Sequence, residues 1–266
     1  MAYILNDSTI FGAGYLDPVS VYKLSVGNNI LRDNFLPIRW AVLNDLVDED
    51  YVVSAIEVGN LDAIKYLSVV DYIWETDFCQ IAAAHGQLDC LIYLNEEGCE
   101  WDEDTCTNAA AGSHLDCLKY AIEEGCEWDK QAYYVATRFG HLDCLEYLHQ
   151  QENGYDNGYL CEVAARYGQL HCLQYLHGEN YIWDVRTCNA AAVSGHLDCL
   201  IYAHEEGCEW TWETCWKAVR NGHLDCLAYA IENGCPYDES VCTYAEAPEI
   251  IHYLQEKGIC QVMSMR

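Results

Sequence analysis

The chain has 266 residues, of which 13 are Lys or Arg and 43 are Asp or Glu, so its formal net charge is −30. This charge argues against nucleic-acid binding, because displacing counterions from phosphates requires positive side chains. It also argues against docking on anionic membranes, and no run of about twenty apolar residues is present to span a bilayer. An acidic chain of this kind favours a protein partner that has a basic surface.

Residues 1–48 stand apart because they do not share the pattern of the rest of the chain. Within them "YLDPVSVYKLS" weakly resembles the middle of an F-box, the segment that binds a ubiquitin-ligase adaptor. The preceding "ILNDSTIF" matches poorly, since Gly12 and Gly14 interrupt a helix there. The alternative is a cap that shields the first repeat. No basic stretch followed by an apolar core opens the chain, so we expect no secretory signal.

Residues 49–260 are built from a repeated unit. Seven copies run from "GNLDAIKYL" at Gly59 to "GHLDCLAYA" at Gly222, with a step of 27 residues and one step of 28. A shortened copy, "APEIIHYL", ends at Leu254. An alanine stands four residues before each glycine, or before Ser113 in the third copy, and an aromatic residue stands eight residues after each repeat's tyrosine. Several columns that agree over seven units predict structural repeats. Residues 261–266 are left as a C-terminal tail.

Each unit has the pattern of two short helices, which we call helix A and helix B. Helix A, as in "DTCTNAAAG", should bury the side chains seven, four and three places before the glycine. Helix B, as in "HLDCLKYAIEEG", places Leu115, Leu118 and Ala121 on one face. The glycine after the acidic pair fits a C-terminal cap. Good N-cap types begin helix A at Asp102, Asp129, Asp184, Thr211 and Asp238.

A two-helix unit cannot bury its apolar face alone, so neighbouring units must stack into an all-α solenoid of about eight units. The pattern "AAxxGHLDCLxYLxExG" resembles the ankyrin repeat from roughly Asp50 to Ile259. Its style is closest to the ankyrin-repeat families of giant DNA viruses and some protists, as in "AIENGCPYDE". The usual ankyrin unit has about 33 residues and a T-P-L-H turn that is missing here. The shortage falls where the β-hairpin finger would lie, so we expect truncated or absent fingers.

The seventeen cysteines fall into three recurring columns, in helix A, in helix B and after the linker glycine. A catalytic thiol is used once, so recurrence predicts packing as small hydrophobic side chains. The histidine and aspartate of "GHLD" also recur, and residues two apart on a helix do not face each other, so we expect the histidine to make local hydrogen bonds at the helix start. The tryptophan column is predicted to pack between helices. We therefore predict no catalytic, cofactor-binding or metal-binding residue, and reduced thiols favour an intracellular, cytoplasm-like compartment, that of an infected cell if the chain is viral.

Positions that vary between units are free to recognise a partner. In helix A these lie ten, six and two places before the glycine, a spacing of four that forms one outward stripe. Tyr, Trp and Arg on this stripe are the types that dominate interface energetics. Two alternatives remain, a favourable helix C-terminal charge for the arginines and packing against the next repeat for Trp216. The predicted partner-binding residues are Lys130, Tyr134, Arg138, Arg166, Trp212, Trp216 and Arg220.

These patterns predict a non-catalytic scaffold that binds a partner protein through its variable helix surface. If residues 1–48 are an F-box, the chain would instead be a substrate adaptor of a ubiquitin ligase, and adaptor capture would distinguish the two. A structural or virion-associated assembly protein is a further alternative, and the oligomeric state stays open. Bound metal would indicate the remaining class, a metalloprotein or redox enzyme.

Overall fold

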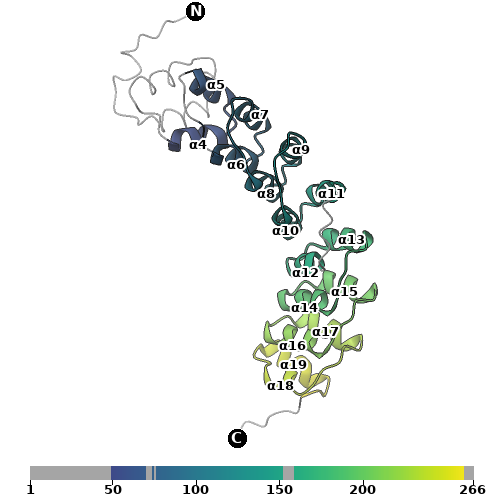
Figure 1. The fold of residues 1–266 in the computed structure, drawn as a ribbon. Helices are drawn as coiled ribbons and strands as arrows, with labels where there is room; N and C mark the ends of the chain where they lie inside the picture. Colours follow the sequence, from purple (N-terminus) through teal and green to yellow (C-terminus); the bar gives the residue numbers. More distant parts are fainter. Residues whose placement is uncertain (1–48, 70–73, 75, 152–158, 261–266) are drawn as a thin grey trace, which may run out of the picture. The chain divides into compact units, whose positions relative to one another are not determined.

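A computed structural model describes residues 49–69, 74, 76–151 and 159–260, and these ranges contain sixteen helices, α4 to α19, and no strand (Figure 1). The chain divides into two compact units, Met1–Trp101 and Asp102–Arg266. The predicted cap or F-box-like segment and the predicted C-terminal tail lie outside the described residues. None of the described helices combines the length and the apolar character that crossing a membrane requires.

The first unit contains two helix pairs. Helix A of each pair packs against its own helix B and against the next helix A, and the two B helices also contact each other. Val52, Ile56, Ile64 and Leu67 are fully buried between them. The helices are α4 (Glu49–Glu57), α5 (Leu61–Val69), α6 (Thr76–Ala84) and α7 (Leu88–Glu96).

The second unit contains six helix pairs, with even-numbered helices as helix A and odd-numbered helices as helix B, and the first five pairs follow the same rule (Figure 1). We call α10, α12, α14 and α16 the helix A row, and α9, α11, α13, α15 and α17 the helix B row. The helices are α8 (Glu103–Ala111), α9 (Leu115–Glu123), α10 (Lys130–Phe139), α11 (Leu142–Gln150), α12 (Tyr159–Arg166), α13 (Leu170–Gly178), α14 (Val185–Ser194), α15 (Leu197–Glu205), α16 (Trp212–Arg220), α17 (Leu224–Glu232), α18 (Ser240–Thr243) and α19 (Pro248–Glu256).

The predicted helix starts are confirmed by their capping bonds. The carboxylates of Asp102, Asp129 and Asp184 each accept a hydrogen bond from the backbone N–H two residues later, at 3.1, 2.7 and 2.9 Å. Each bond satisfies one of the N–H groups that the first turn leaves without a partner in the helix. Thr211 forms a capping box with Thr214 at the start of α16. Local sequence therefore fixes where each helix A begins.

The predicted core columns of helix A are confirmed. Cys106, Ala109 and Ala110 are fully buried, and the equivalent positions of the other units are buried as well. These small side chains let successive A helices pack closely. Helix B differs from the prediction in one respect, because Leu115 is half-buried while Cys117 is buried beside Leu118 and Ala121. Leu115 lies in the first turn, at the edge of the contact with neighbouring helices.

The histidines of the "GHLD" pattern join neighbouring units. We expected local hydrogen bonds at the helix start, and this expectation needs correction. His141 Nε2 donates to the carbonyl of Ala111 at 2.9 Å, and His223 Nε2 donates to the carbonyl of Val193 at 3.0 Å, thirty residues earlier. Gln169, which takes the place of the histidine in its unit, makes the equivalent bond to the preceding unit, at the carbonyl of Arg138. Each side chain thus satisfies a carbonyl that the end of the preceding helix A leaves without a helical partner.

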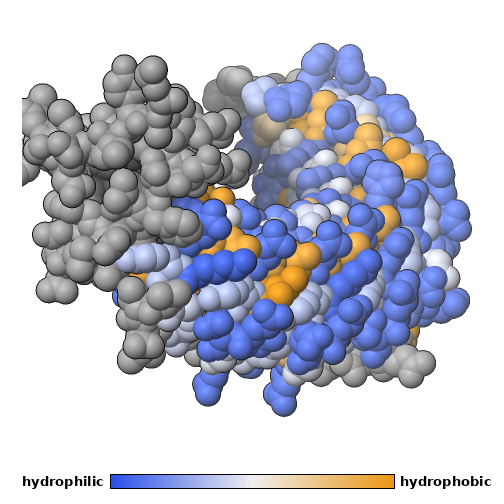
Figure 2. Space-filling model, turned by 90° about the horizontal axis from the view of Figure 1, so that it is seen from above, coloured by the Kyte–Doolittle hydropathy of each residue, from blue (hydrophilic) through white to orange (hydrophobic). Residues whose placement is uncertain are grey.

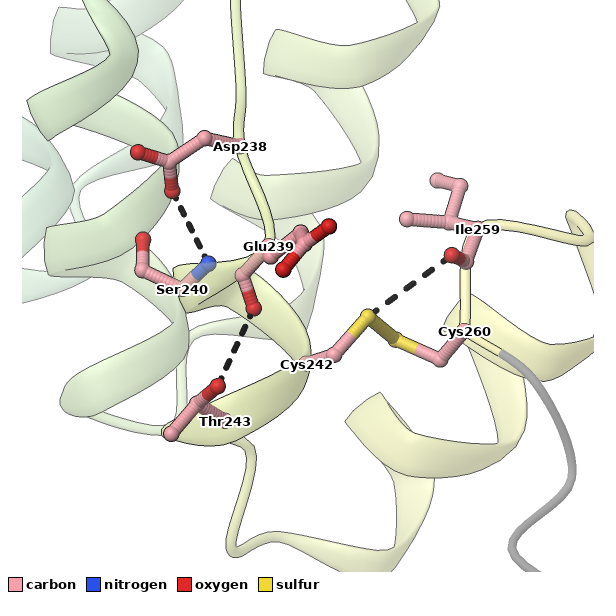
Figure 3. Close-up of a disulfide and its surroundings, with 7 residues drawn as sticks. All are labelled: Asp238, Glu239, Ser240, Cys242, Thr243, Ile259 and Cys260. Atoms are coloured by element: carbon pink, nitrogen blue, oxygen red, sulfur yellow. Dashed lines mark hydrogen bonds between the residues drawn. A yellow bond between two sulfur atoms is a disulfide. The ribbon is translucent and has the colours of Figure 1, made fainter.

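The C-terminal helix pair contains a disulfide. Cys242 of α18 and Cys260 after α19 are bonded, and Cys242 Sγ lies 3.7 Å from the carbonyl oxygen of Ile259 (Figure 3). The sequence prediction treated every cysteine as a packed thiol, so this pair is an exception to it. The other fifteen cysteines are buried thiols, as predicted.

Candidate partner-binding surface

All seven predicted partner-binding residues lie in α10, α12 and α16, which belong to the helix A row. Successive helices of this row pack against one another, so the seven side chains follow one side of the second unit. Their exposure differs. Lys130, Arg166, Arg220 and Trp212 are exposed, whereas Tyr134, Arg138 and Trp216 are half-buried.

One group of these side chains forms around Arg138, and we call it the tyrosine–arginine cluster. The Arg138 guanidinium lies 4.9 Å from the ring centre of Tyr167 and 5.2 Å from that of Phe139. Tyr134 stacks on Tyr159 with ring centres 6.1 Å apart and an angle of 13° between the rings. A hydrogen bond to Tyr167 raises the pKa of Tyr134. Phe139 and Tyr159 are exposed, so the cluster presents apolar surface beside a cation.

A second group lies around Trp216, and we call it the tryptophan–arginine cluster. The rings of Trp212 and Trp216 are 6.4 Å apart, and Tyr244 of the next unit approaches Trp216 edge-on at 6.0 Å. The Arg220 guanidinium lies 5.2 Å from the centre of the Trp216 ring. Trp216 therefore packs against the following repeat, as its alternative interpretation proposed. Trp212 and Tyr244 remain exposed beside it.

Between the two clusters the helix A row is polar. Glu162 bonds to Arg166 at 2.7 Å and lies 3.9 Å from Arg186, and Lys217 bonds to Glu213 at 3.1 Å. Each pair has one exposed partner, Arg166, Arg186 or Glu213, that water screens, whereas Glu162 is only 13% exposed. They also put two carboxylates among the basic groups of this surface.

The variable stripe is not wholly outward, which corrects the sequence prediction. Its middle position is buried at Thr107 and at Asn189, with exposed fractions of 8% and 5%. The Asn189 amide donates to Glu213 at 3.3 Å, and its oxygen accepts a bond from Thr214 at 2.9 Å. Adjacent A helices pack so closely in these two units that this position lies between them, whereas Tyr134 and Trp216 at the same position are half-buried.

The structure adds residues that the stripe missed, namely Phe139, Tyr159, Arg186, Lys217 and Tyr244. The first four lie next to positions of the stripe rather than on its four-residue spacing, and Tyr244 lies after the end of α18.

The signal in the sequence that could have found these residues is the distribution of basic side chains. Of the nine Lys and Arg in the described ranges, six lie in the helix A row, where only two acidic residues occur. The helix B row has the opposite balance, with one Lys and eight Asp or Glu.

Three cations of the helix A row have no acidic partner. Within the described part of the chain, no carboxylate lies in salt-bridge distance of Lys130, Arg138 or Arg220. Arg138 and Arg220 rest on aromatic rings instead, which leaves the N–H edges of a guanidinium available to a further group. The preceding helix, α8, carries Glu103 and Asp104, so the basic surface begins at α10.

The cysteine columns have the properties of packed thiols. Burial raises the pKa of Cys144 to about 11 and that of Cys199 to about 12, so these helix B thiols stay protonated at neutral pH. A hydrogen bond from the Cys188 thiol lowers the pKa of Cys208, but both side chains are buried. Reactive thiols are accessible as well as ionised, so none of these is a candidate nucleophile. In the described ranges, no group of three or more His, Cys, Asp or Glu is arranged to hold a metal ion.

The tryptophan column packs between helices, as the sequence predicts. His204 stacks on Trp210 with ring centres 3.7 Å apart, and its Nδ1 is hydrogen-bonded to the Tyr229 hydroxyl at 3.0 Å. His177 and Trp183 repeat the arrangement one unit earlier, with ring centres 3.8 Å apart. These rings hold adjacent units together, whereas the rings of Phe139, Tyr159 and Trp212 in the helix A row stay 48%, 43% and 45% exposed.

Comparison with known proteins agrees with this architecture. Residues 79–159, under a third of the chain, match the family model for ankyrin repeats in three copies. One of the 118 matching chains of solved structures is the human ASB11 ankyrin repeat domain, with a TM-score of 0.53. The fold is an ankyrin-repeat solenoid. The likeness to ASB11 covers 59% of this chain and 84% of that one at 18% identity, and therefore concerns the fold alone. No curated protein sequence matches the solenoid.

Proposed function

We propose that this solenoid is a non-catalytic scaffold that binds a partner protein through its helix A row. Ankyrin repeats are protein–protein interaction modules in general. The observation that carries the proposal here is the pair of clusters, in which exposed aromatic rings stand beside arginines on one side of the second unit. Hydrophobic side chains reach the surface as separate patches in a mainly hydrophilic exterior (Figure 2). Exposed aromatic rings that their neighbours cover only in part favour association with a partner.

The energetics of association favour this surface over the helix B row. Interfaces draw most of their binding free energy from a few Trp, Tyr and Arg side chains that become fully desolvated. Trp212 is 45% exposed, so a partner that covers it removes a large apolar area from water. Its neighbours Trp216 and Arg220 already hold each other in place, which lowers the entropy lost on binding.

Site-specific photocrosslinking tests this proposal. Benzoylphenylalanine would replace Trp212, and in a matched control it would replace Tyr237, which is aromatic and equally exposed at 45% but lies in the linker between α17 and α18, outside the helices of the helix A row. In lysate of the cells that make the protein, we expect a discrete protein adduct at position 212 and none at 237. The adduct should disappear in the Trp216→Ala, Arg220→Ala double variant. An adduct that survives the double variant, or that forms equally from position 237, would show that the partner binds elsewhere.

The other candidate functions remain predictions. The ubiquitin-ligase adaptor rests on residues 1–48, which lie outside the described residues. The virion-associated assembly protein rests on the style of the repeats alone. A partner with a basic surface suits the acidic helix B row, whereas the clusters that carry the proposed function lie on the basic row. No specific contact favours any of these candidates over the scaffold.

A further inference from the structure

We infer that the partner segment that binds the helix A row is acidic and carries an aromatic or aliphatic anchor residue. This inference rests on the proposed function and adds the chemistry of the partner to it. It also reverses, for this surface, the sign of partner charge that the net charge of the whole chain favours.

Charge segregation is the first observation behind it. The helix A row carries six Lys or Arg against two Glu, although the whole chain carries 13 against 43. Beyond a Debye length of about 8 Å, salt screens exposed charges, so a docked segment responds mainly to the groups next to it. A segment that lies along this row therefore meets a local excess of positive charge, even though the chain as a whole is strongly negative.

The state of the individual cations is the second observation. Arg138 and Arg220 lie against the rings of Tyr167 and Trp216, and no described carboxylate pairs with either. A guanidinium that lies over a ring is restrained in position while its N–H groups can still point away from the ring, which suits bidentate binding of a carboxylate. Although 43 residues of the chain are acidic, none of the described carboxylates lies within salt-bridge distance of these two arginines. The guanidinium groups of both arginines are therefore available to bind carboxylates of another molecule.

The anchor follows from the tryptophan–arginine cluster. Trp212 and Tyr244 expose their rings on two sides of the half-buried Trp216. Apolar or aromatic side chains are the groups that gain free energy by covering such rings. An acidic residue at Arg220 and an anchor at Trp212 would therefore bind side by side.

The size of the surface sets the length of the segment. From α10 to α16 the row makes three steps between adjacent helices, each about 8–10 Å, or about 30 Å in all. An extended segment of about nine residues covers that distance. Such a segment can place one acidic residue at Arg138, another at Arg220, and polar or basic residues between them.

The carboxylates within the row favour a protein segment over a nucleic acid. Glu162 and Glu213 lie between the two clusters, where a continuous phosphate backbone would meet them. A peptide can put a polar or basic side chain opposite each of them, whereas a nucleic acid presents negative charge at every step. The net charge of −30 further opposes the approach of a long polyanion.

Selection of peptides from a random library tests the inference without choosing the answer in advance. Phage that display random peptides of about twelve residues, which extend over about 40 Å, would be selected on the full chain. We expect enrichment of Asp and Glu together with aromatic or aliphatic residues. Enrichment of Lys and Arg among peptides that the Trp216→Ala, Arg220→Ala variant no longer binds would overturn the inference and leave the proposed function standing. If selection yields no peptide, or only peptides that bind the double variant as well as the wild type, both the inference and the proposed function would be overturned.

Charge reversals then test the residues. Binding of the selected peptide, labelled with fluorescein, would be followed by anisotropy for Arg138→Glu, Arg220→Glu and the control Lys119→Glu. Lys119 also lies over a ring, that of Tyr147, but belongs to the helix B row. All three variants have the same net charge, so only the position differs. We expect each arginine variant to bind about tenfold more weakly and the lysine variant to bind as wild type does.

Two results would overturn this assignment. An equal loss in Lys119→Glu would mean that the peptide responds to the charge of the whole chain and not to the helix A row. Binding of a labelled single-stranded poly-uridine probe that Arg220→Glu abolishes would mean that the row takes a nucleic acid.

Discussion

At the scale of single residues, Gly195 at the end of α14 satisfies two requirements. Gly195 has a φ of +77°, a conformation that costs residues with a side chain about 1–2 kcal/mol. A Cβ at Gly195 would also lie 2.5 Å from Nδ1 of His223, the side chain that bonds to Val193. Gly207, in the linker, has a similar φ of +86° but no atom within 4 Å of its Cβ direction. Alanine substitutions at the two positions therefore separate the free-energy cost of backbone strain from the cost of displacing His223 of the next unit.

We expect Gly207→Ala to lower the free energy of unfolding by about 1 kcal/mol, which is the strain of its backbone alone. Gly195→Ala should lower it by about 3 kcal/mol, because its methyl group also displaces His223 and breaks a buried hydrogen bond. Urea denaturation followed by circular dichroism would measure both. Equal losses would mean that the histidine does not join adjacent units in the way described.

At the scale of helix pairs, the last unit differs from the others in how it is held. Its helix A, α18, has only four residues and offers little apolar surface. The disulfide between Cys242 and Cys260 closes a segment with a sequence separation of 18, which runs from within α18 to a residue just after α19. Closing a segment of this length stabilises a fold by about 3 kcal/mol, mainly by restricting the unfolded chain.

Counting thiols by mass spectrometry tests this disulfide. Iodoacetamide in denaturant without reductant should modify fifteen cysteines, and prior reduction should raise the number to seventeen. The Cys242→Ser, Cys260→Ser variant should take fifteen groups under both conditions. Seventeen groups on the unreduced wild-type protein would show that the last unit is held by packing alone.

Much of each helix pair could be predicted from the sequence, because its determinants are local. An aspartate at the start, small residues three and four apart and a glycine at the end each act within one or two turns. The contacts that the sequence did not reveal join residues far apart in the chain. His141 reaches a carbonyl of the preceding unit, Asn189 is buried by the next helix A, and Cys242 meets Cys260 only after the last pair has formed.

At the scale of the whole molecule, the net charge hides a division between its two helix rows. Acidic residues concentrate in the helix B row and the linkers, while most of the described Lys and Arg lie in the helix A row. The predicted binding residues all lie in the helix A row, because the variable aromatic and basic positions fall there. The sign of the partner's charge could not be predicted in the same way, because an average over 266 residues gives no information about one surface.

The most direct test of the proposed binding surface is hydrogen–deuterium exchange of the whole chain, alone and saturated with the selected peptide. If the helix A row binds, exchange slows in peptides from α10, α12, α14 and α16, while those from α9, α11, α13, α15 and α17 exchange as in the free chain. Slowing that is confined to the helix B row or to residues 1–48 would contradict it.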